Sequence, residues 1–283
     1  MTDLAVRAVR RLATAPGFRH LTRVQPLLRL SFALRASLVQ EGLRFATNEL
    51  RRRPVTGVYR LRESGVAIVI RHHTGDVMVL DEIFSQQEYE PPREAEVALS
   101  ALPAAPRVVD LGANIGLFGA WVLARYPEAT IVAVEADPSN AAIHRRAIEA
   151  NGLDARWRLV DGFASTGPGI IRFAAGLHAT SHAVDREEEW LEVPTVDVLP
   201  ELVGADLVKI DIEGAEWDLL ADPRFARTRP RVVVLEYHQE GCPEPDPPAT
   251  AEKALRAAGL EVVPTGRKPQ LGAGLLWAFG PVD

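Results

Sequence analysis

Val108-Val-Asp-Leu-Gly-Ala-Asn-Ile-Gly116 is the stretch of the sequence that decides the fold. It reads as an apolar strand ending in a carboxylate, Asp110, and then a turn through Gly112, Asn114 and Gly116 into a helix. Because glycine has no Cβ, such a turn lets the backbone approach a ligand closely. The stretch therefore predicts a site for a nucleotide-like cofactor at the end of the first strand of an α/β domain.

Four further strand-like runs also end in acidic residues, at Glu135, Asp161, Asp211 and Glu236. About 25 residues separate successive ends, apart from a double-length interval between Asp161 and Asp211. This is the length of one strand and its return helix, so we expect an α/β fold with a mostly parallel, doubly wound sheet. Ligands bind at the carboxyl edge of such a sheet, where these acidic side chains gather.

The remaining segments flank or interrupt this domain. Residues 1–55 predict an Arg-rich helical leader, a lid or an arm through which a homodimer forms. Residues 56–103 predict a β-rich lead-in segment with strands at 58–62, 66–70 and 77–80. Residues 104–283 form the main domain, with a flap inserted at about 167–196 and an antiparallel strand near the C-terminus.

Composition and charge exclude several classes of protein. The only cysteine is Cys242, which rules out an internal disulfide and a Cys-based zinc site and favours the cytoplasm. We expect no membrane span, because the longest apolar runs have only strand length. The first 55 residues hold eleven arginines against three carboxylates. This basic segment could contact nucleic acid or an anionic membrane, act as a presequence or, as we favour, dock on the acidic remainder.

Two cofactors compete for the glycine turn. A dinucleotide turn has the pattern G-x-G-x-x-G, whereas Asn114 occupies the middle glycine position here. Asp110 would repel a pyrophosphate, but it suits the ammonium and sulfonium groups of S-adenosylmethionine. Glu135 would accept hydrogen bonds from the ribose diol, and Asp161 and Gly162 would lie at the adenine edge. S-adenosylmethionine is therefore the expected cofactor, and NAD is the alternative.

Two motifs resemble those of the FkbM-type S-adenosylmethionine-dependent methyltransferases: Asp110-Leu-Gly-Ala-Asn-Ile-Gly116 and, more specifically, Lys209-Ile-Asp-Ile-Glu-Gly-Ala-Glu216. Further similarity lies in 193–197, 235–238 and upstream residues between 70 and 89, so the resemblance covers about 56–280 and leaves the leader unexplained. It implies a Rossmann-like class I methyltransferase fold. It also implies methylation of hydroxyl groups, typically on sugars, glycans or polyketide natural products.

Methyl transfer to a hydroxyl needs a base, a metal ion or both, because an alcohol is a poor nucleophile while it keeps its proton. Asp211 and Glu213 end the fourth strand, and Glu236 and His238 end the fifth. Residues i and i+2 share a face of a strand, so each of these two pairs could point the same way if the strands stay regular there. In one interpretation His238 or Asp211 takes the proton while Glu213 or Glu236 orients the base. In the other, Asp211, Glu236 and His238 hold Mg²⁺ or a similar cation that binds the substrate oxygens. Glu216 could belong to this edge or only cap the next helix.

Two other functions remain as alternatives, a nucleic-acid methyltransferase and an S-adenosylmethionine-binding protein without turnover. Enzymes that methylate amino groups in DNA resemble Asp-Pro-Pro-Tyr at the end of the fourth strand, where this chain has Asp211-Ile-Glu-Gly214. Acidic residues at the mouth of the site would also repel phosphate. The expected partner is thus a small molecule or oligosaccharide that carries a hydroxyl group, and no nucleic acid is expected.

Overall fold

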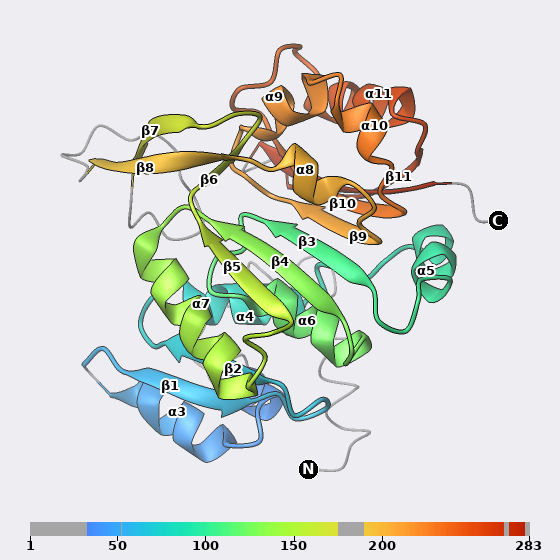
Figure 1. Cartoon of the computed structure of the whole chain (residues 1–283). Coiled ribbons are helices and arrows are strands. Elements are labelled where there is room, and N and C mark those ends of the chain that lie inside the picture. The colour runs from blue at the N-terminus through green and yellow to red at the C-terminus, as the bar shows by residue number, and fades with distance from the viewer. Residues whose placement is uncertain (1–32, 52, 175–189, 269–271, 281–283) are drawn as a thin grey trace. The chain divides into compact units, whose positions relative to one another are not determined.

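The computed structural model describes residues 33–51, 53–174, 190–268 and 272–280, and the chain divides into two compact units (Figure 1). One unit ends at Tyr89 and the other begins at Glu90, so residues 90–103 lie in the same unit as the main sheet. Most of the predicted dimer arm lies outside the described residues. No helix among the residues described is long and apolar enough to cross a membrane.

The first unit contains two antiparallel strands, β1 (Thr56–Arg60) and β2 (Ala67–Arg71). It also contains the helices α3 (Gly42–Leu50) and α4 (Asp76–Phe84). The strand predicted at 77–80 is wrong, because these residues form the start of α4. Val77, Leu80 and Ile83 are buried three residues apart, which is a helical and not an alternating pattern. A run of four apolar residues is too short to distinguish the periodicity of a helix from that of a strand.

The second unit is built on a seven-stranded sheet in the order β11-β12-β10-β9-β3-β4-β5. Its first half contains α5 (Arg93–Ser100), β3 (Arg107–Leu111), α6 (Leu117–Arg125), β4 (Thr130–Glu135), α7 (Pro138–Asn151) and β5 (Trp157–Asp161). The second half contains α8 (Leu199–Leu202), β9 (Leu207–Ile210), α9 (Glu216–Ala221), α10 (Phe225–Thr228), β10 (Val232–His238), α11 (Pro247–Ala257), β11 (Glu261–Lys268) and β12 (Ala273–Phe279).

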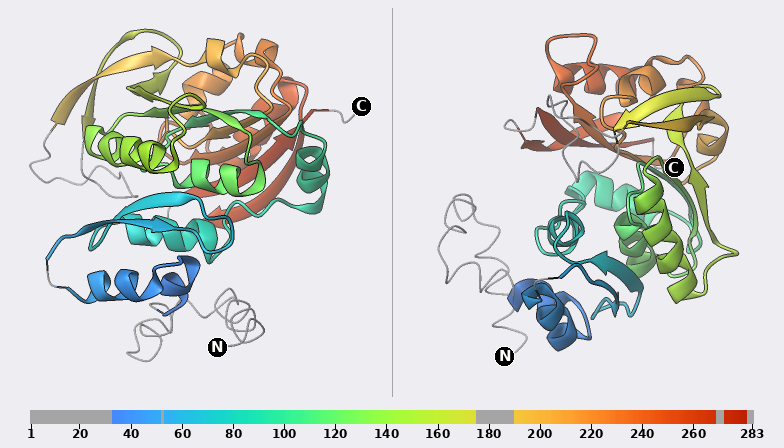
Figure 2. Two further views of the ribbon diagram at one scale, coloured as in Figure 1. Left: turned by 60° about the horizontal axis from the view of Figure 1, so that its bottom comes forward. Right: turned by 90° about the vertical axis from the view of Figure 1, so that its left-hand side faces the viewer.

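Five neighbouring strands of this sheet are parallel, and β12 pairs antiparallel with both β10 and β11. Helices α6 and α7 lie on one side of the sheet and α9 and α11 on the other (Figures 1 and 2). The predicted α/β class, with a mostly parallel doubly wound sheet and an antiparallel strand near the C-terminus, is therefore confirmed. Because helices cover both faces, the central strands are mostly apolar, with Asp110 on β3 and Lys209 on β9 as exceptions.

One buried hydrophobic core lies between the sheet and the helices α9 and α11. It includes Val109, Leu111, Val208, Ile210, Val233, Leu235, Leu219, Leu220, Ala251 and Leu255. A separate three-stranded sheet, in the order β6-β8-β7, occupies the long interval before β9. Its strands are β6 (Phe163–Ser165), β7 (Gly169–Ala174) and β8 (Trp190–Asp197). Residues 175–189 of the predicted flap lie outside the described residues.

Candidate active site at the carboxyl edge of the sheet

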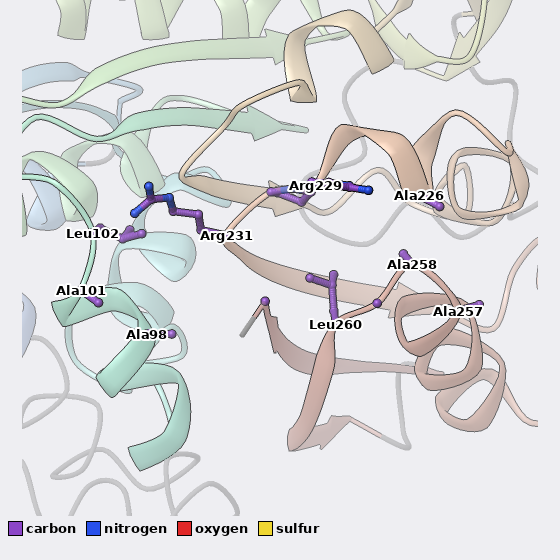
Figure 3. Close-up of a pocket in the computed structure, with 12 residues that line it drawn as sticks. Ala98, Ala101, Leu102, Ala226, Arg229, Arg231, Ala257, Ala258 and Leu260 are labelled. Carbon is purple, nitrogen blue, oxygen red and sulfur yellow. The ribbon is translucent and has the colours of Figure 1, made fainter. Parts of the chain in front are cut away.

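One pocket, of about 650 Å³, lies at the amino edge of the sheet (Figure 3). Its lining includes Leu102 before β3, Arg231 before β10 and Leu260 before β11. Arg231 points toward Leu102, whereas Arg229 points the other way, toward Ala226 (Figure 3). Because ligands of doubly wound sheets bind at the carboxyl ends of the strands, this pocket is at the wrong edge for the predicted chemistry.

The glycine turn follows β3 as predicted, but its glycines serve protein packing. Gly112, Asn114 and Gly116 all have left-handed φ values, of +74°, +49° and +88°. A Cβ at Gly112 would lie 1.8 Å from the carbonyl oxygen of Asp211, and one at Gly116 would lie 2.7 Å from the ring of His144. Close approach of the chain's own atoms therefore requires glycine at these two positions.

Two charged side chains bind the backbone of the turn, Glu135 through its N–H groups and Lys209 through its carbonyl oxygens. Glu135, at the end of β4, accepts the N–H of Asn114 at 2.6 Å and that of Asp137 at 2.8 Å. The ammonium of Lys209 donates to the carbonyl oxygens of Gly112 at 2.9 Å and Leu111 at 3.3 Å. Burial raises the pKa of Glu135 to about 7, although its two backbone hydrogen bonds oppose this shift. Glu135 is therefore placed to bind the turn and to titrate near neutral pH.

Asp110 lies behind the turn and not at the open edge. Its carboxylate is fully buried, and one oxygen lies 3.4 Å from Nζ of Lys209, its neighbour in register on β9. Burial raises the pKa of Asp110, and the charge of Lys209 opposes that shift. Burial would lower the pKa of Lys209, but the carboxylates of Asp211 and Asp110 outweigh it and raise the pKa. Because the side chain of Asp110 is buried, direct contact with a ligand would require the surrounding atoms to move.

Asp161 is placed at the same edge as Glu135, because the two residues are register partners on β5 and β4. Asp161 is exposed and pairs with Arg145 of α7. At Gly162, φ is +153° and a Cβ would lie 2.7 Å from Val196, so the chain passes close to β8 there. The structure thus brings the residues predicted for ribose and adenine to adjacent strand ends.

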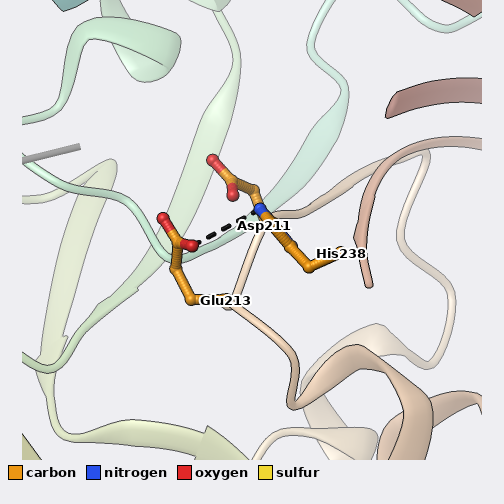
Figure 4. A group of neighbouring side chains, drawn as sticks. All are labelled: Asp211, Glu213 and His238. Atoms are coloured by element: carbon orange, nitrogen blue, oxygen red, sulfur yellow. Dashed lines mark ion pairs between the residues drawn. The ribbon is translucent and has the colours of Figure 1, made fainter. Parts of the chain in front are cut away.

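Asp211, Glu213 and His238 form a cluster in which one potential ligand atom from each lies within 4.8 Å of the others (Figure 4). Asp211 and Glu213 follow β9, and His238 ends the neighbouring strand β10. Nε2 of His238 lies 3.4 Å from Oε2 of Glu213, and Asp211 lies 3.2 Å from Nζ of Lys209. Glu236, predicted with them as a metal ligand, is not in this cluster.

The backbone explains why Glu213 takes the place expected for Glu236. β9 ends at Ile210, and Glu213 has a left-handed φ of +51°, so the strand alternation assumed for residues 211 and 213 no longer applies. Glu236 stays within β10 and is 9% exposed, and its charge contributes to the raised pKa of Lys209.

Glu216 both caps a turn and orients His238, so the two roles considered for it coexist. Its carboxylate is fully buried and accepts the N–H of Gly214 at 2.7 Å and that of His238 at 2.7 Å. The same carboxylate accepts from Nδ1 of His238 at 3.1 Å. Burial would lower the pKa of His238, but Glu216, Asp211 and Glu213 outweigh it and raise the pKa to about 9.

Lys209 is the main site residue that sequence reasoning missed. It is one of only three lysines in the chain, and it interrupts an apolar strand, Leu207–Ile210, that is buried along its whole length. A lysine is almost never fully buried without a charged partner. That mismatch was the available signal for an ion pair inside the sheet.

The fold and the site together define a class of protein. A doubly wound sheet with a glycine turn after β3 and acidic side chains at its carboxyl edge is a framework that binds a nucleotide-like cofactor. Residues 110–259 match the model of the methyltransferase FkbM domain, so the chain belongs to this family of S-adenosylmethionine-dependent methyltransferases. The resemblance of the two motifs is thereby confirmed.

Individual relatives are more distant. The chain is 27% identical over 191 residues to "Methyltransferase 1" of Beauveria bassiana, which covers 55% of this chain and 72% of that protein. It is 28% identical over 205 residues to "Methyltransferase sdnD" of Sordaria araneosa, which covers 58% and 75%. Among solved structures it is similar to a methyltransferase FkbM from Methylobacillus flagellatus, with a TM-score of 0.45, 13% identity and coverage of 92% and 60%.

Proposed function

We propose that this methyltransferase transfers the methyl group to a hydroxyl of a sugar, a glycan or a glycosylated or polyketide natural product. The observation that carries the proposal is the cluster of Asp211, Glu213 and His238 at the end of two adjacent parallel strands. An amine acceptor needs no such help once it is neutral, whereas a hydroxyl must lose its proton as it attacks. The acidic character of this cluster also disfavours a nucleic-acid acceptor, because it repels phosphate.

The residues for the methyl donor fit a ligand that carries a ribose and a positive charge. Glu135 and Asp161 lie side by side at the strand ends, where they would accept from the ribose hydroxyls and bind near the adenine edge with Gly162. Each oxygen of Glu135 uses one lone pair on a backbone N–H and keeps another for a ligand. Asp110 does not reach the donor itself but pairs with Lys209, whose ammonium binds the turn.

S-adenosylmethionine supplies a methyl group on a sulfonium: the carbon–sulfur bond breaks, its electron pair stays on sulfur, and a carbon–oxygen bond forms to the acceptor. The chain must hold the acceptor oxygen in line with that bond and take up the hydroxyl proton. Asp211 is the proposed proton acceptor, because its side chain is 25% exposed and reachable from the edge. Glu213 and His238 flank it and position the hydroxyl group.

A labelled-methyl assay tests the proposal. The purified full chain is incubated with methyl-labelled S-adenosylmethionine and a panel of sugars, glycosides and polyketide alcohols, together with amine and nucleic-acid acceptors. We expect label on oxygen in at least one hydroxyl acceptor. Label only on amines or nucleic acid would contradict the proposal. Donor binding without any labelled product would instead favour a binding protein without turnover.

A further inference from the structure

We propose that Asp211, Glu213 and His238 bind a hard divalent cation such as Mg²⁺ or Mn²⁺, and that Glu216 positions the imidazole for it. The inference deepens the proposed hydroxyl methylation and rests on it for the identity of the acceptor. The ion site itself rests on the arrangement of the four side chains (Figure 4).

The distances suit a single ion. One oxygen of Asp211, one of Glu213 and one ring nitrogen of His238 all lie within 4.8 Å of one another. Neighbouring ligands of an ion with bonds of about 2.1–2.4 Å lie roughly 3.0–3.4 Å apart. Nε2 of His238 and Oε2 of Glu213 lie 3.4 Å apart, which matches that spacing before any adjustment.

The hydrogen bonds of His238 give an observation independent of the acidic cluster. A carboxylate can only accept, so the contact between Glu216 and Nδ1 places a proton on Nδ1, and Nε2 is the ring nitrogen that would bind an ion on losing its own proton. Nε2 lies on the side of Glu213 (Figure 4). Histidines that bind metal ions usually donate their other ring nitrogen to such a partner. Glu216 is itself fixed by the N–H groups of Gly214 and His238, so the ring is held in the orientation of a ligand.

The charges around the cluster favour an additional cation. Asp211, Glu213 and Glu216 bring three carboxylates to one imidazole. Lys209 lies 3.2 Å from Asp211, but it also pairs with Asp110 and donates to two carbonyl oxygens of the turn. Its ammonium is therefore held by Asp110 and the turn, on the buried side of the cluster. A divalent ion would supply positive charge on the outer side, where Glu213 is 39% exposed.

The ion would define the class of acceptor. Three protein ligands leave about three positions of an octahedral ion open to water or substrate oxygens. An acceptor with a second oxygen on the neighbouring carbon, such as a vicinal diol, would fill two of them. The ion would lower the pKa of the hydroxyl. As the hydroxyl oxygen attacks the methyl carbon, the hydroxyl proton would pass to the carboxylate oxygen of Asp211 that does not bind the ion.

Mn²⁺ binding to the full chain, measured by electron paramagnetic resonance without donor or acceptor, tests the ion site. We expect one saturable site with a Kd below about 1 mM. Asp211→Asn and Glu213→Gln should each weaken it at least about tenfold, because each removes a charged ligand. Glu240→Gln, an exposed carboxylate two residues beyond His238, is the matched control and should change it less than about threefold.

Absence of a saturable site, or full binding by Glu213→Gln with loss in Glu236→Gln, would overturn the inference. Asp211→Asn removes a charged partner of Lys209, so thermal unfolding is measured for each variant to check that it folds. If Asp211→Asn proves unstable, the ion site is judged from Glu213→Gln alone. S-adenosylmethionine affinity is measured in parallel by calorimetry. Donor binding and hydroxyl methylation without Mn²⁺ binding would refute only the ion site, whereas Mn²⁺ binding without hydroxyl methylation would refute only the proposed function.

Discussion

Lys209 and Asp110 form an ion pair inside the central sheet, with Nζ 3.4 Å from a carboxylate oxygen and both side chains at most 5% exposed. The two residues are register partners on adjacent parallel strands. From this position Lys209 also reaches the carbonyl oxygens of the turn and the carboxylate of Asp211. One buried ammonium therefore joins the proposed donor half of the site to the acceptor half.

Lys209→Met should lower the free energy of unfolding by about 3–5 kcal/mol, because it leaves Asp110 as an uncompensated buried charge. Urea unfolding followed by tryptophan fluorescence measures the change. Adding Asp110→Asn to Lys209→Met should recover at least about 1 kcal/mol, since the stranded charge is removed. If Asp110→Asn instead lowers the free energy of unfolding of Lys209→Met by as much as it lowers that of the parent, the two side chains are not coupled as the structure indicates.

Gly112→Ala should destabilise the protein well beyond the ordinary cost of a left-handed residue. Its Cβ would lie 1.8 Å from the carbonyl oxygen of Asp211, which adds about 1–3 kcal/mol of overpacking to about 1–2 kcal/mol for the conformation. Gly152→Ala is the matched control, because Gly152 is also left-handed but has open space around its Cβ position. Equal losses in thermal unfolding for the two variants would contradict the packing role of Gly112.

His144 should make stability depend on pH between about 4 and 6.5. Burial lowers its pKa from 6.5 to about 4, so in this window the unfolded chain binds a proton that the folded chain does not. The free energy of unfolding should therefore rise with pH through the window, by about 3 kcal/mol, and stop rising above it. Urea unfolding at a series of pH values measures the slope.

His144→Phe should flatten this rise, whereas His73→Asn should leave it in place. His73 is exposed and has a positive φ that asparagine tolerates, which makes it a suitable control. A slope that persists unchanged in His144→Phe would assign the dependence to other groups.

Glu135 should make donor affinity depend on pH in the neutral range. Its pKa of about 7 means that the carboxylate, which we propose accepts from ribose hydroxyls, is fully formed only above neutral pH. Calorimetry should show S-adenosylmethionine binding about tenfold more tightly at pH 8 than at pH 6. Glu135→Gln should bind more weakly and without this dependence, and the exposed Glu149→Gln should behave as the parent. Affinity that falls as pH rises would refute this role.

The succession of strand–helix units and the edge where their acidic ends gather were predictable, because Asp110, Glu135, Asp161, Asp211 and Glu236 recur at the spacing of such units. Side-chain partners were less predictable. The glycine turn predicted close approach of the backbone to a ligand, but it gave no sign that Asp211 and His144 would pack against Gly112 and Gly116. Contacts between residues so far apart in sequence depend on tertiary packing, which a local motif does not encode.

The membership of the acceptor cluster was only partly predictable for the same reason. Alternation along a strand paired Glu236 with His238, but the chain leaves the strand after Ile210 and turns Glu213 toward His238. The left-handed φ of Glu213 has no strong signal in the sequence, since glutamate rarely adopts it. Val77–Leu80 failed as a strand because four apolar residues do not distinguish a strand from a helix.

We propose that hydroxyl methylation takes place at the cluster of Asp211, Glu213 and His238. It is tested most directly by measuring methyl transfer and S-adenosylmethionine affinity side by side in Asp211→Asn and His238→Ala. We predict that transfer to the hydroxyl acceptor falls at least about 100-fold while the donor Kd changes less than about threefold. Transfer at the parental rate in both variants would contradict the account.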